Sequence, residues 1–327
     1  MFLGDEWRYF KYLTLSTVSI ICLVVIYTPS YHLAPPKQVV GWELNVTRET
    51  RAYVVPENET ALISGKEICQ DSFLNILIVV CSAPENGAQR LAIRETWASQ
   101  NISSVKVAFL LGWPTNVTLQ STIEEESNEF KDIIQENFID SYNNLTVKSV
   151  MMLKWFLHQC PSPRYLMKTD DDMFVNVANL SALLSKANST VLIGSLICRA
   201  KPILDIRNKW YVPKYIYKKS FYPNYLSGTG YVMSREVAAK LYDVALSTPI
   251  IHLEDVYITG ICALKAGIRP RNHASFTYSH RGLGCEADMI TNHRLTPQQL
   301  HIAWAQRNNC TKNVKPTKQT TTQSSCH

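Results

Sequence analysis

The chain has 327 residues, of which 46% are hydrophobic and 18% charged, and it carries a formal net charge of +6 at pH 7. This composition is that of an ordinary globular protein, and the length allows one large core or two modest ones. The Lys and Arg residues are scattered without a basic run, which predicts a solvated surface and argues against nucleic-acid binding.

An uncharged, largely apolar run extends from Tyr12 to Tyr27. As a helix it spans about 24 Å at about 1.5 Å per residue, slightly short of a standard bilayer core but tolerated by thin early-secretory membranes. Arg8 and Lys11 precede the run, and positive charge on that side favours a cytosolic N-terminus. We therefore expect a cytoplasmic tail at 1–11, a transmembrane signal-anchor at 12–28 and a lumenal body. A cleaved signal peptide is the alternative.

Two features support a lumenal body, because both belong to the secretory path. The nine cysteines contain no C-x-x-C pair, so they favour disulfides over metal binding, with connectivity left open. The disulfide candidates are Cys160, Cys198, Cys262, Cys285 and Cys310. The eight Asn-x-Ser/Thr sequons begin at Asn45, Asn58, Asn101, Asn116, Asn144, Asn179, Asn188 and Asn309.

Patterning divides the body into a stem, a folded domain and a tail. Residues 29–70 carry prolines and weak periodicity, which predicts a stem, and residues 311–327 lack apolar anchors, which predicts disorder. The catalytic domain is expected at 71–310. Its predicted strands cover 73–82, 105–112 and 191–196, and its predicted helices cover 123–137 and 145–159. This alternation predicts an open α/β sheet with a mononucleotide site at the carboxyl ends of its strands.

Three consecutive carboxylates, Asp170, Asp171 and Asp172, interrupt an apolar run at 165–175. Like charges repel one another, so this cluster predicts a partner of opposite sign, and a hard divalent cation with oxygen ligands fits best. A solvated acidic turn is the alternative, but apolar residues on both sides predict buried flanks.

Three further patterns each allow a structural and a functional interpretation. Arg90 and Arg94 share one helix face. This face is either a solvated basic surface or a clamp for phosphate groups. The stretch from Tyr222 to Ser234 mixes aromatic residues with glycines. It predicts either a glycine-rich turn before an ordinary strand or a surface that binds sugar rings. Glu254 and Asp255 open an apolar helix, where one carboxylate is expected to cap the helix and the other is free for chemistry.

These residues together resemble the β-1,3-galactosyltransferase and β-1,3-N-acetylglucosaminyltransferase family, glycosyltransferase family 31, whose members are type II Golgi membrane enzymes. The resemblance covers about residues 73 to 310 in the family's order. The matching motifs are Arg90-x-x-Ile93-Arg94-x-Thr96-Trp97, Phe109 to Gly112, Asp140-Ser141-Tyr142-x-Asn144-Leu145-Thr146-x-Lys148, Lys168 to Asn176, Lys209-Trp210-Tyr211, Tyr222 to Ser234, Glu254 to Tyr257, and His293 followed by Pro297 and Trp304.

The resemblance implies a GT-A-type mixed sheet flanked by helices, a UDP-sugar donor and Mn²⁺. It implies that Asp172 and His293 bind the metal and that Asp255 is the catalytic base. The implied nucleotide-sugar residues are Arg90, Arg94, Lys168, Asp170 and Asp171. The implied donor or acceptor sugar residues are Tyr225, Gly228, Gly230 and Glu254.

The expected function is transfer of galactose from UDP-galactose, with inversion, to a GlcNAc-like or related terminal sugar of a glycoprotein or glycolipid. The segment Ser227 to Gly230 resembles the galactosyltransferase branch, whereas Leu226 replaces a cysteine common in that branch. One alternative is a β-1,3-N-acetylglucosaminyltransferase that uses UDP-GlcNAc. The other is a catalytically silent lumenal glycan-binding protein, against which the intact Asp172, Asp255 and His293 speak.

Overall fold

The computed structural model describes residues 3–27, 37–100, 102–187, 190–283, 287–307 and 326. The chain forms two compact units, one reaching to Gln38 and one beginning at Val39. The first unit contains helix α1 (Leu3–Tyr27), which includes most of the expected signal-anchor. Within the described residues, no helix combines the length and the apolar character needed to cross a membrane.

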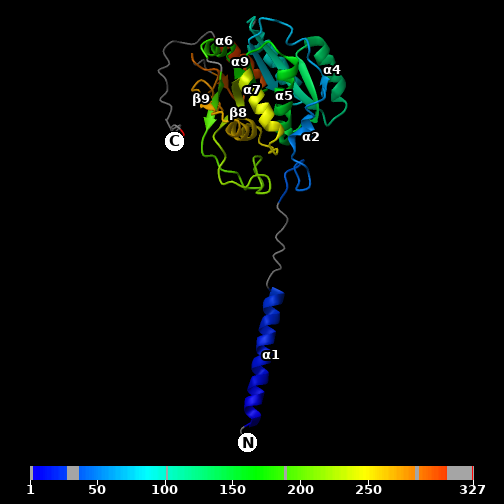
Figure 1. The fold of residues 1–327 in the computed structure, drawn as a ribbon, viewed down its shortest axis with the longest axis vertical. Coiled ribbons are helices and arrows are strands. Elements are labelled where there is room, and N and C mark those ends of the chain that lie inside the picture. Colours follow the sequence, from blue (N-terminus) through cyan, green and yellow to red (C-terminus); the bar gives the residue numbers. More distant parts are fainter. Residues whose placement is uncertain are drawn as a thin grey trace. The chain divides into compact units, whose positions relative to one another are not determined.

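The second unit is built around one mixed sheet of eight strands in the spatial order β1-β4-β3-β2-β5-β8-β7-β9 (Figure 1). β2, β3, β4 and β5 run parallel, whereas β8 is antiparallel to both β5 and β7. A two-stranded sheet joins β6 to β10. The strands are β1 (Ala61–Ile63), β2 (Ile76–Cys81), β3 (Val105–Trp113), β4 (Ile133–Ile139), β5 (Tyr165–Asp170), β6 (Phe174–Val175), β7 (Leu192–Ile197), β8 (Tyr225–Ser234), β9 (Arg271–Asn272) and β10 (Thr291–Asn292).

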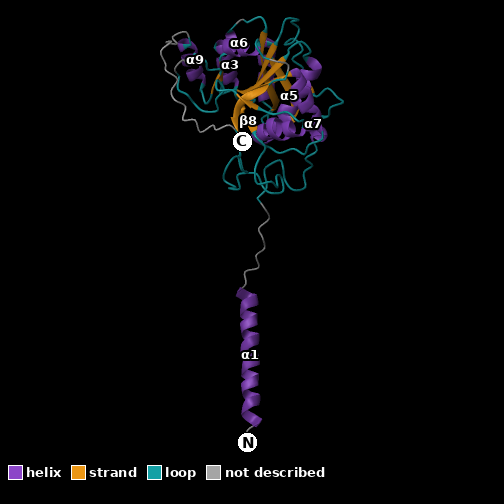
Figure 2. Cartoon of the chain, turned by 60° about the vertical axis from the view of Figure 1, so that its left-hand side comes forward, coloured by secondary structure: helices purple, strands orange, loops and turns teal. Residues whose placement is uncertain are grey.

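Helices cover both faces of the sheet, with α5 and α7 on one side and α3, α6 and α9 on the other (Figure 2). Because strand side chains alternate, Leu77 and Val79 pack into the first core and Ile78 and Val80 into the second. The helices of this unit are α2 (Thr50–Val54), α3 (Gly87–Glu95), η1 (Trp97–Ser99), α4 (Leu119–Phe130), η2 (Tyr142–Asn144), α5 (Leu145–Gln159), α6 (Val177–Leu184), α7 (Arg235–Leu246), η3 (Val256–Cys262), α8 (Ala263–Lys265) and α9 (Pro297–Gln306).

The structure confirms an α/β fold with a large mixed sheet, but it corrects one predicted helix. The acidic helix expected at 123–137 is α4, which ends at Phe130, and the segment after it is strand β4. Lys131 has a φ of 56°, a left-handed cap that stops the helix. The apolar residues beyond it then pair with β3, so tertiary pairing overrides the helical pattern.

The stem expected at 29–70 is wrong from Val39 onward, because this stretch belongs to the folded unit. Trp42 is 1% exposed and donates its indole N–H to the carbonyl of Asn143 at 2.7 Å. Buried Thr50 bonds the hydroxyl of Tyr257 at 2.8 Å, and β1 adds a strand to the sheet beside β4. The segment reads as a stem in sequence because its contacts lie far away along the chain.

Two disulfides link described residues, Cys69–Cys160 and Cys198–Cys326. Among the candidates, Cys160 and Cys198 are therefore confirmed, whereas Cys262 is wrong, because it is a buried free thiol. Cys285 and Cys310 lie outside the described residues, as does the expected disordered tail at 311–327 apart from Cys326.

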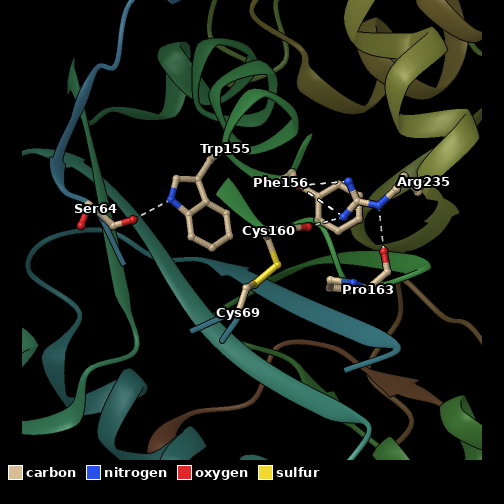
Figure 3. Close-up of a disulfide and its surroundings, with 7 residues drawn as sticks. All are labelled: Ser64, Cys69, Trp155, Phe156, Cys160, Pro163 and Arg235. Atoms are coloured by element: carbon tan, nitrogen blue, oxygen red, sulfur yellow. Dashed lines mark hydrogen bonds between the residues drawn. A yellow bond between two sulfur atoms is a disulfide. The ribbon is translucent and has the colours of Figure 1, made fainter. Parts of the chain in front are cut away.

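The Cys69–Cys160 bond ties the segment before β2 to the end of α5 (Figure 3). Next to it, Trp155 donates to the carbonyl of Ser64 at 2.7 Å, and Arg235 contacts the carbonyl of Cys160. The bond closes a loop between residues 91 apart, and such a link strongly restricts the unfolded chain.

We expect the double variant Cys69→Ser, Cys160→Ser to lose about 2–5 kcal/mol of unfolding free energy. Chemical denaturation followed by circular dichroism would measure this loss. Cys22→Ser, which removes an exposed free thiol, is the matched control and is expected to leave the unfolding free energy unchanged. A double variant as stable as the wild type would contradict the assigned bond.

Candidate active site

The three aspartates lie at the carboxyl end of β5, as the sequence predicts. Asp170 is the last residue of this strand and pairs in register with Cys81 at the end of β2. Asp171 accepts hydrogen bonds from Ser82 at 2.7 Å and from Asn86 at 2.8 Å, both in the turn that follows β2. Burial and the neighbouring carboxylates raise its pKa despite these bonds. Asp171 therefore joins two strand ends, and Asp170 and Asp172 remain available to a ligand.

Asp172 and His293 meet because the short strands β6 and β10 pair antiparallel beside them. The Nε2 atom of His293 lies 3.2 Å from Oδ2 of Asp172, and its Nδ1 atom lies 2.8 Å from the carbonyl of Tyr278. Burial alone would lower the pKa of His293, but the hydrogen bond and charge of Asp172 raise it. The expected pair of metal ligands is thus brought together.

The donor set of this pair fits a divalent metal ion. A backbone carbonyl at Nδ1 fixes the tautomer that leaves Nε2 free to ligate, and metal-binding histidines usually have such a hydrogen-bond partner at their other ring nitrogen. Oδ1 of Asp172 is buried and has no hydrogen-bond partner, so a cation would satisfy it. Among the described residues, no group of three or more His, Cys, Asp or Glu side chains could hold a metal ion.

Asp255 begins helix η3 and faces the glycine-rich part of β8. Its Oδ1 accepts from the N–H of Val256 at 2.8 Å, and its Oδ2 accepts from the N–H of Gly228 at 3.2 Å. A Cβ at Gly228 would lie 3.3 Å from the Cβ of Asp255, so glycine permits this close approach. Burial raises the pKa of Asp255, which makes it a stronger base than a free aspartate.

Glu254 has a different role from its neighbour. It is 5% exposed, receives a 2.5 Å hydrogen bond from the hydroxyl of Tyr231, and lies 3.7 Å from the ammonium of Lys168. Burial raises its pKa to about 7, although Lys168 opposes the shift. The helix cap is therefore Asp255 rather than Glu254, and Glu254 supports the site from below the surface.

Lys168 is buried and contacts three groups of the site, on Asp170, Gly228 and Glu254. Its ammonium donates to Oδ1 of Asp170 and to the carbonyl of Gly228, both at 2.5 Å. Burial alone would lower the pKa of Lys168, but the charges of Asp170 and Glu254 raise it. Lys168 thus fixes the carboxylate at the end of β5 against the backbone of β8, and its expected contact with the nucleotide would be indirect.

Tyr225 and Gly230 lie on the same strand as Gly228. The ring of Tyr225 makes an edge contact with Tyr222, and burial together with the charge of Asp255 raises its pKa. Gly230 pairs with Thr169 on β5, and a Cβ there would meet Thr291 at 3.4 Å. Tyr225 therefore lies near the carboxylate of Asp255, whereas Gly230 packs within the sheet.

The structure places Arg90 in a buried hydrogen-bond network. It is 1% exposed and uses all five N–H donors within the protein. Two go to Glu126, and the others go to Ser82 and to the carbonyls of Ala83 and Pro84. The predicted phosphate clamp is therefore wrong for Arg90 in this arrangement. Arg90 instead positions the turn whose Ser82 binds Asp171.

Arg94 also has a structural position. It binds Asp132 through two 2.8 Å hydrogen bonds, pairs with Glu126, and stacks on the rings of Phe109 and Phe130. It lines a cavity of about 750 Å³ that none of the site carboxylates lines. Sequence spacing placed the two arginines on one helix face correctly, but that face packs on α4.

We expect Arg90→Ala to unfold the domain more easily rather than only to weaken donor binding. Removing one member of a buried ion pair leaves the other charge unpaired, which costs about 3–5 kcal/mol. Thermal denaturation would measure the loss, and Arg207→Ala, which removes an exposed pair with Asp205, is the matched control. An Arg90→Ala variant with wild-type stability and weaker donor binding would contradict this structural role and support the predicted phosphate clamp.

The individual sequence patterns did not single out two features of the site. Lys148 and Asp140 form a buried 2.7 Å ion pair, and they also bind the carbonyl of Ser82 and the N–H of Gly112, which locks the strand ends together. Tyr142 is 44% exposed near Asp255 and Asp170, whose charges, after burial, raise its pKa to about 12. Its exposed aromatic ring offers a stacking surface for a sugar.

Comparisons with known proteins place this geometry in a family. The family model for galactosyltransferase matches residues 88–274, which include the aspartates of β5 and Asp255. The chain belongs to the galactosyltransferase family. Beta-1,3-galactosyltransferase 1 of Mus musculus is 34% identical over 296 residues, covering 80% of this chain and 90% of that protein. This galactosyltransferase-family chain is accordingly a hexosyltransferase.

Two further relatives differ in the sugar named. Beta-1,3-galactosyltransferase 5 of Mus musculus is 39% identical and covers 70% of this chain and 77% of that protein. Lactosylceramide 1,3-N-acetyl-beta-D-glucosaminyltransferase of Mus musculus is 36% identical, and the match covers 66% of this chain and 61% of that protein. The crystal structure of S. aureus TarS 1-349 with UDP has a TM-score of 0.39 at 12% identity, covering 70% of this chain and 63% of that chain.

Proposed function

We propose that this enzyme is an inverting β-1,3-galactosyltransferase of GT-A type that uses UDP-galactose and Mn²⁺. The observation that carries the proposal is that an Asp–His pair suited to a metal ion and a separate buried carboxylate suited to act as a base lie in the same unit. Asp172 faces His293 at 3.2 Å, and Asp255 approaches the backbone of β8 at Gly228. Lys168 links the two by contacting both Asp170 and Gly228.

Asp172 and His293 are the residues that would hold the metal. A divalent cation there would stabilise the charge that develops on the diphosphate as it leaves. A carboxylate oxygen with an imidazole nitrogen suits Mn²⁺ better than Mg²⁺, which prefers an all-oxygen shell. The side chain of Asp170 is partly exposed next to Asp171 and Asp172 in the sequence. With Asp171 held by Ser82 and Asn86, Asp170 would orient the nucleotide.

The proposed reaction is a direct displacement. The sugar of UDP-galactose is α-linked, so a β product requires attack from the opposite face. Asp255 takes the proton from the acceptor hydroxyl, the hydroxyl oxygen bonds to the anomeric carbon, and the bond to the diphosphate breaks with its electron pair leaving on UDP. Both oxygens of Asp255 accept backbone hydrogen bonds, which hold the carboxylate in place for this role.

Two nucleotide sugars are candidates for the donor. The names of two relatives and the Ser227 to Gly230 segment favour galactose, and the third relative favours N-acetylglucosamine as the second candidate. Screening the full chain with UDP-galactose and UDP-GlcNAc separates the two. The silent glycan-binding alternative predicts turnover of neither donor.

We further propose that the apolar run from Tyr12 to Tyr27 anchors the enzyme in the Golgi membrane with the catalytic unit in the lumen. The run from Tyr12 to Tyr27 and the sequons support this placement. The acceptor would then be a glycoprotein or glycolipid of the secretory path. Digestion of the catalytic unit by protease added to sealed vesicles would refute the topology.

Sequon use in the lumen should follow exposure of the asparagine. Asn45, Asn58 and Asn116 are exposed, whereas Asn144 and Asn179 are half-buried and donate their amide hydrogens to backbone carbonyls. We expect glycans on the first three and none on the last two, measured by mass spectrometry after glycosidase treatment. Asn101, Asn188 and Asn309 lie outside the described residues. Occupancy of Asn144 or Asn179 would contradict this prediction.

A further inference from the structure

The segment between β7 and β8 is a long, strongly basic loop. Residues 199–221 contain seven Lys and Arg residues and a single acidic residue, Asp205. All seven basic side chains are exposed: Arg199, Lys201, Arg207, Lys209, Lys214, Lys218 and Lys219. Arg207 pairs with Asp205 at 3.0 Å, and none of the other six forms an ion pair with a described residue. The loop therefore presents positive charge that the rest of the described chain does not neutralise.

The same loop exposes large apolar side chains among its basic residues. Leu204 is 57% exposed, Ile206 47%, Phe221 44% and Trp210 43%. The ammonium of Lys201 lies 5.3 Å from the ring of Phe221, so charged and apolar groups adjoin. Apolar and aromatic residues interleaved with lysines are typical of surfaces that sit in the headgroup region of a lipid bilayer. A purely polyanionic partner gives no reason to expose Leu204 and Ile206.

The loop is held in a fixed conformation against the domain. Val212 and Ile216 are buried, and the N–H of Val212 bonds the carbonyl of Ile203 at 2.9 Å. The hydroxyl of Tyr215 donates to the carbonyl of Trp42 at 3.0 Å and accepts from the N–H of Val39 at 3.1 Å. Figure 1 shows this green to yellow-green segment looping out from the sheet before β8. The exposed groups are therefore presented by a buried framework.

The loop also borders the catalytic carboxylate. The ammonium of Lys209 lies 4.9 Å from the ring of Trp210 and 5.4 Å from the ring of Tyr142. Tyr142 lies close enough to Asp255 for the carboxylate charge to raise the pKa of the tyrosine. The same charge raises the pKa of Tyr225, the first residue of β8 after the loop. A surface docked on the loop would hold its sugars beside Asp255.

We propose that the loop at 199–221 docks on an anionic lipid surface and presents lipid-borne acceptor sugars to Asp255. The inference rests on the proposed transferase function. Each Lys or Arg near an anionic bilayer contributes about fivefold in affinity, and salt screens this attraction. The apolar side chains add contact that a soluble polyanion would not need.

Hydrogen exchange of the full chain tests the docking without relying on activity. We expect anionic vesicles, one third phosphatidylserine in phosphatidylcholine, to protect backbone amides of 199–221, and pure phosphatidylcholine vesicles to leave them unprotected. The fourfold variant Lys201→Gln, Lys214→Gln, Lys218→Gln, Lys219→Gln should need at least about tenfold more anionic lipid for half-maximal protection. The matched control is the fourfold variant Lys106→Gln, Lys131→Gln, Lys186→Gln, Lys240→Gln, which removes equal charge from exposed sites outside the loop and should behave as the wild type.

Equal protection by both kinds of vesicle, or an equal loss in the two fourfold variants, would overturn the proposal. The double variant Leu204→Ser, Ile206→Ser separates the possible partners, because it should weaken protection by vesicles but not by a soluble polyanion such as heparin. Protection by heparin alone would show an anionic glycan as the partner instead.

Activity measurements keep this inference distinct from the proposed function. The loop variant should transfer to a soluble GlcNAc glycoside as the wild type does, and should lose at least about tenfold in kcat/KM for the same sugar on an anionic vesicle. If the wild type transferred sugar to neither acceptor, the transferase proposal would be refuted. The hydrogen-exchange result would still decide whether the loop docks on the lipid surface.

Discussion

The Asp255→Asn variant is expected to turn over about 10²–10⁴-fold more slowly than the wild type, because a positioned general base contributes a factor of that size. The substitution preserves the shape of the side chain and removes its ability to take a proton. Donor binding should be retained, since Asp255 contacts Gly228 and Val256 rather than the residues of the metal pair. Initial rates at saturating donor and calorimetric binding of UDP would measure the two quantities.

Two controls keep this result interpretable. Asp255 also caps η3, so the unfolding temperature must show that the variant is folded. Glu254→Gln is the neighbouring control, and it should lose less activity because Glu254 is buried against Tyr231 and Lys168. The opposite ranking of the two variants would move the base to Glu254.

Burial raises the pKa of Asp255, and this shift sets the direction of the pH dependence. A base works only when ionised, so the acidic limb of kcat/KM should lie above the range of an ordinary aspartate. The limb should vanish from the residual rate of Asp255→Asn. An unchanged limb in that variant would assign it to another group.

Removal of the metal is expected to have the second large effect. A chelator should abolish transfer, and Mn²⁺ should restore it better than Mg²⁺ because the ligand pair mixes oxygen and nitrogen. His293→Ala should raise the Mn²⁺ concentration for half-maximal activity by at least about 10–100-fold, the range seen when even outer-shell partners are lost.

His301→Ala is the matched control for the metal experiment, because His301 pairs with Glu95 at the surface. Binding of Mn²⁺ in the presence of UDP, followed by electron paramagnetic resonance, gives a readout separate from activity. Wild-type Mn²⁺ affinity in His293→Ala would show that the ligand assignment is wrong, and Asp172→Asn should fail in the same way if the pair acts together.

The strands and the acidic site could be predicted from sequence because their signals are local. Continuous apolar runs marked β2 and β5, and three adjacent aspartates between apolar segments required a particular environment. The match of predicted and observed α5, from Leu145 to Gln159, follows from helical spacing over fifteen residues. In each case a short window contains the physical reason for the structure.

The errors arose where distant contacts decide the outcome. Arg90 has the same local pattern whether its partner is a phosphate or Glu126, which is 36 residues away. The stretch around Trp42 looked like a stem because the groups that bond it come from η2 and from the loop before β8. The pairing of Asp172 with His293 rested on the family resemblance, since 121 residues separate the two in sequence.

The product of a single defined reaction reports on both the donor and the mechanism. The full chain would be incubated with UDP-galactose, Mn²⁺ and a simple GlcNAc glycoside, and the linkage and anomeric configuration of the product would be read by nuclear magnetic resonance. The proposed mechanism predicts a β-1,3-linked galactose and no comparable product from UDP-GlcNAc. An α-linked product would contradict displacement assisted by Asp255, and transfer from UDP-GlcNAc alone would contradict the assigned donor.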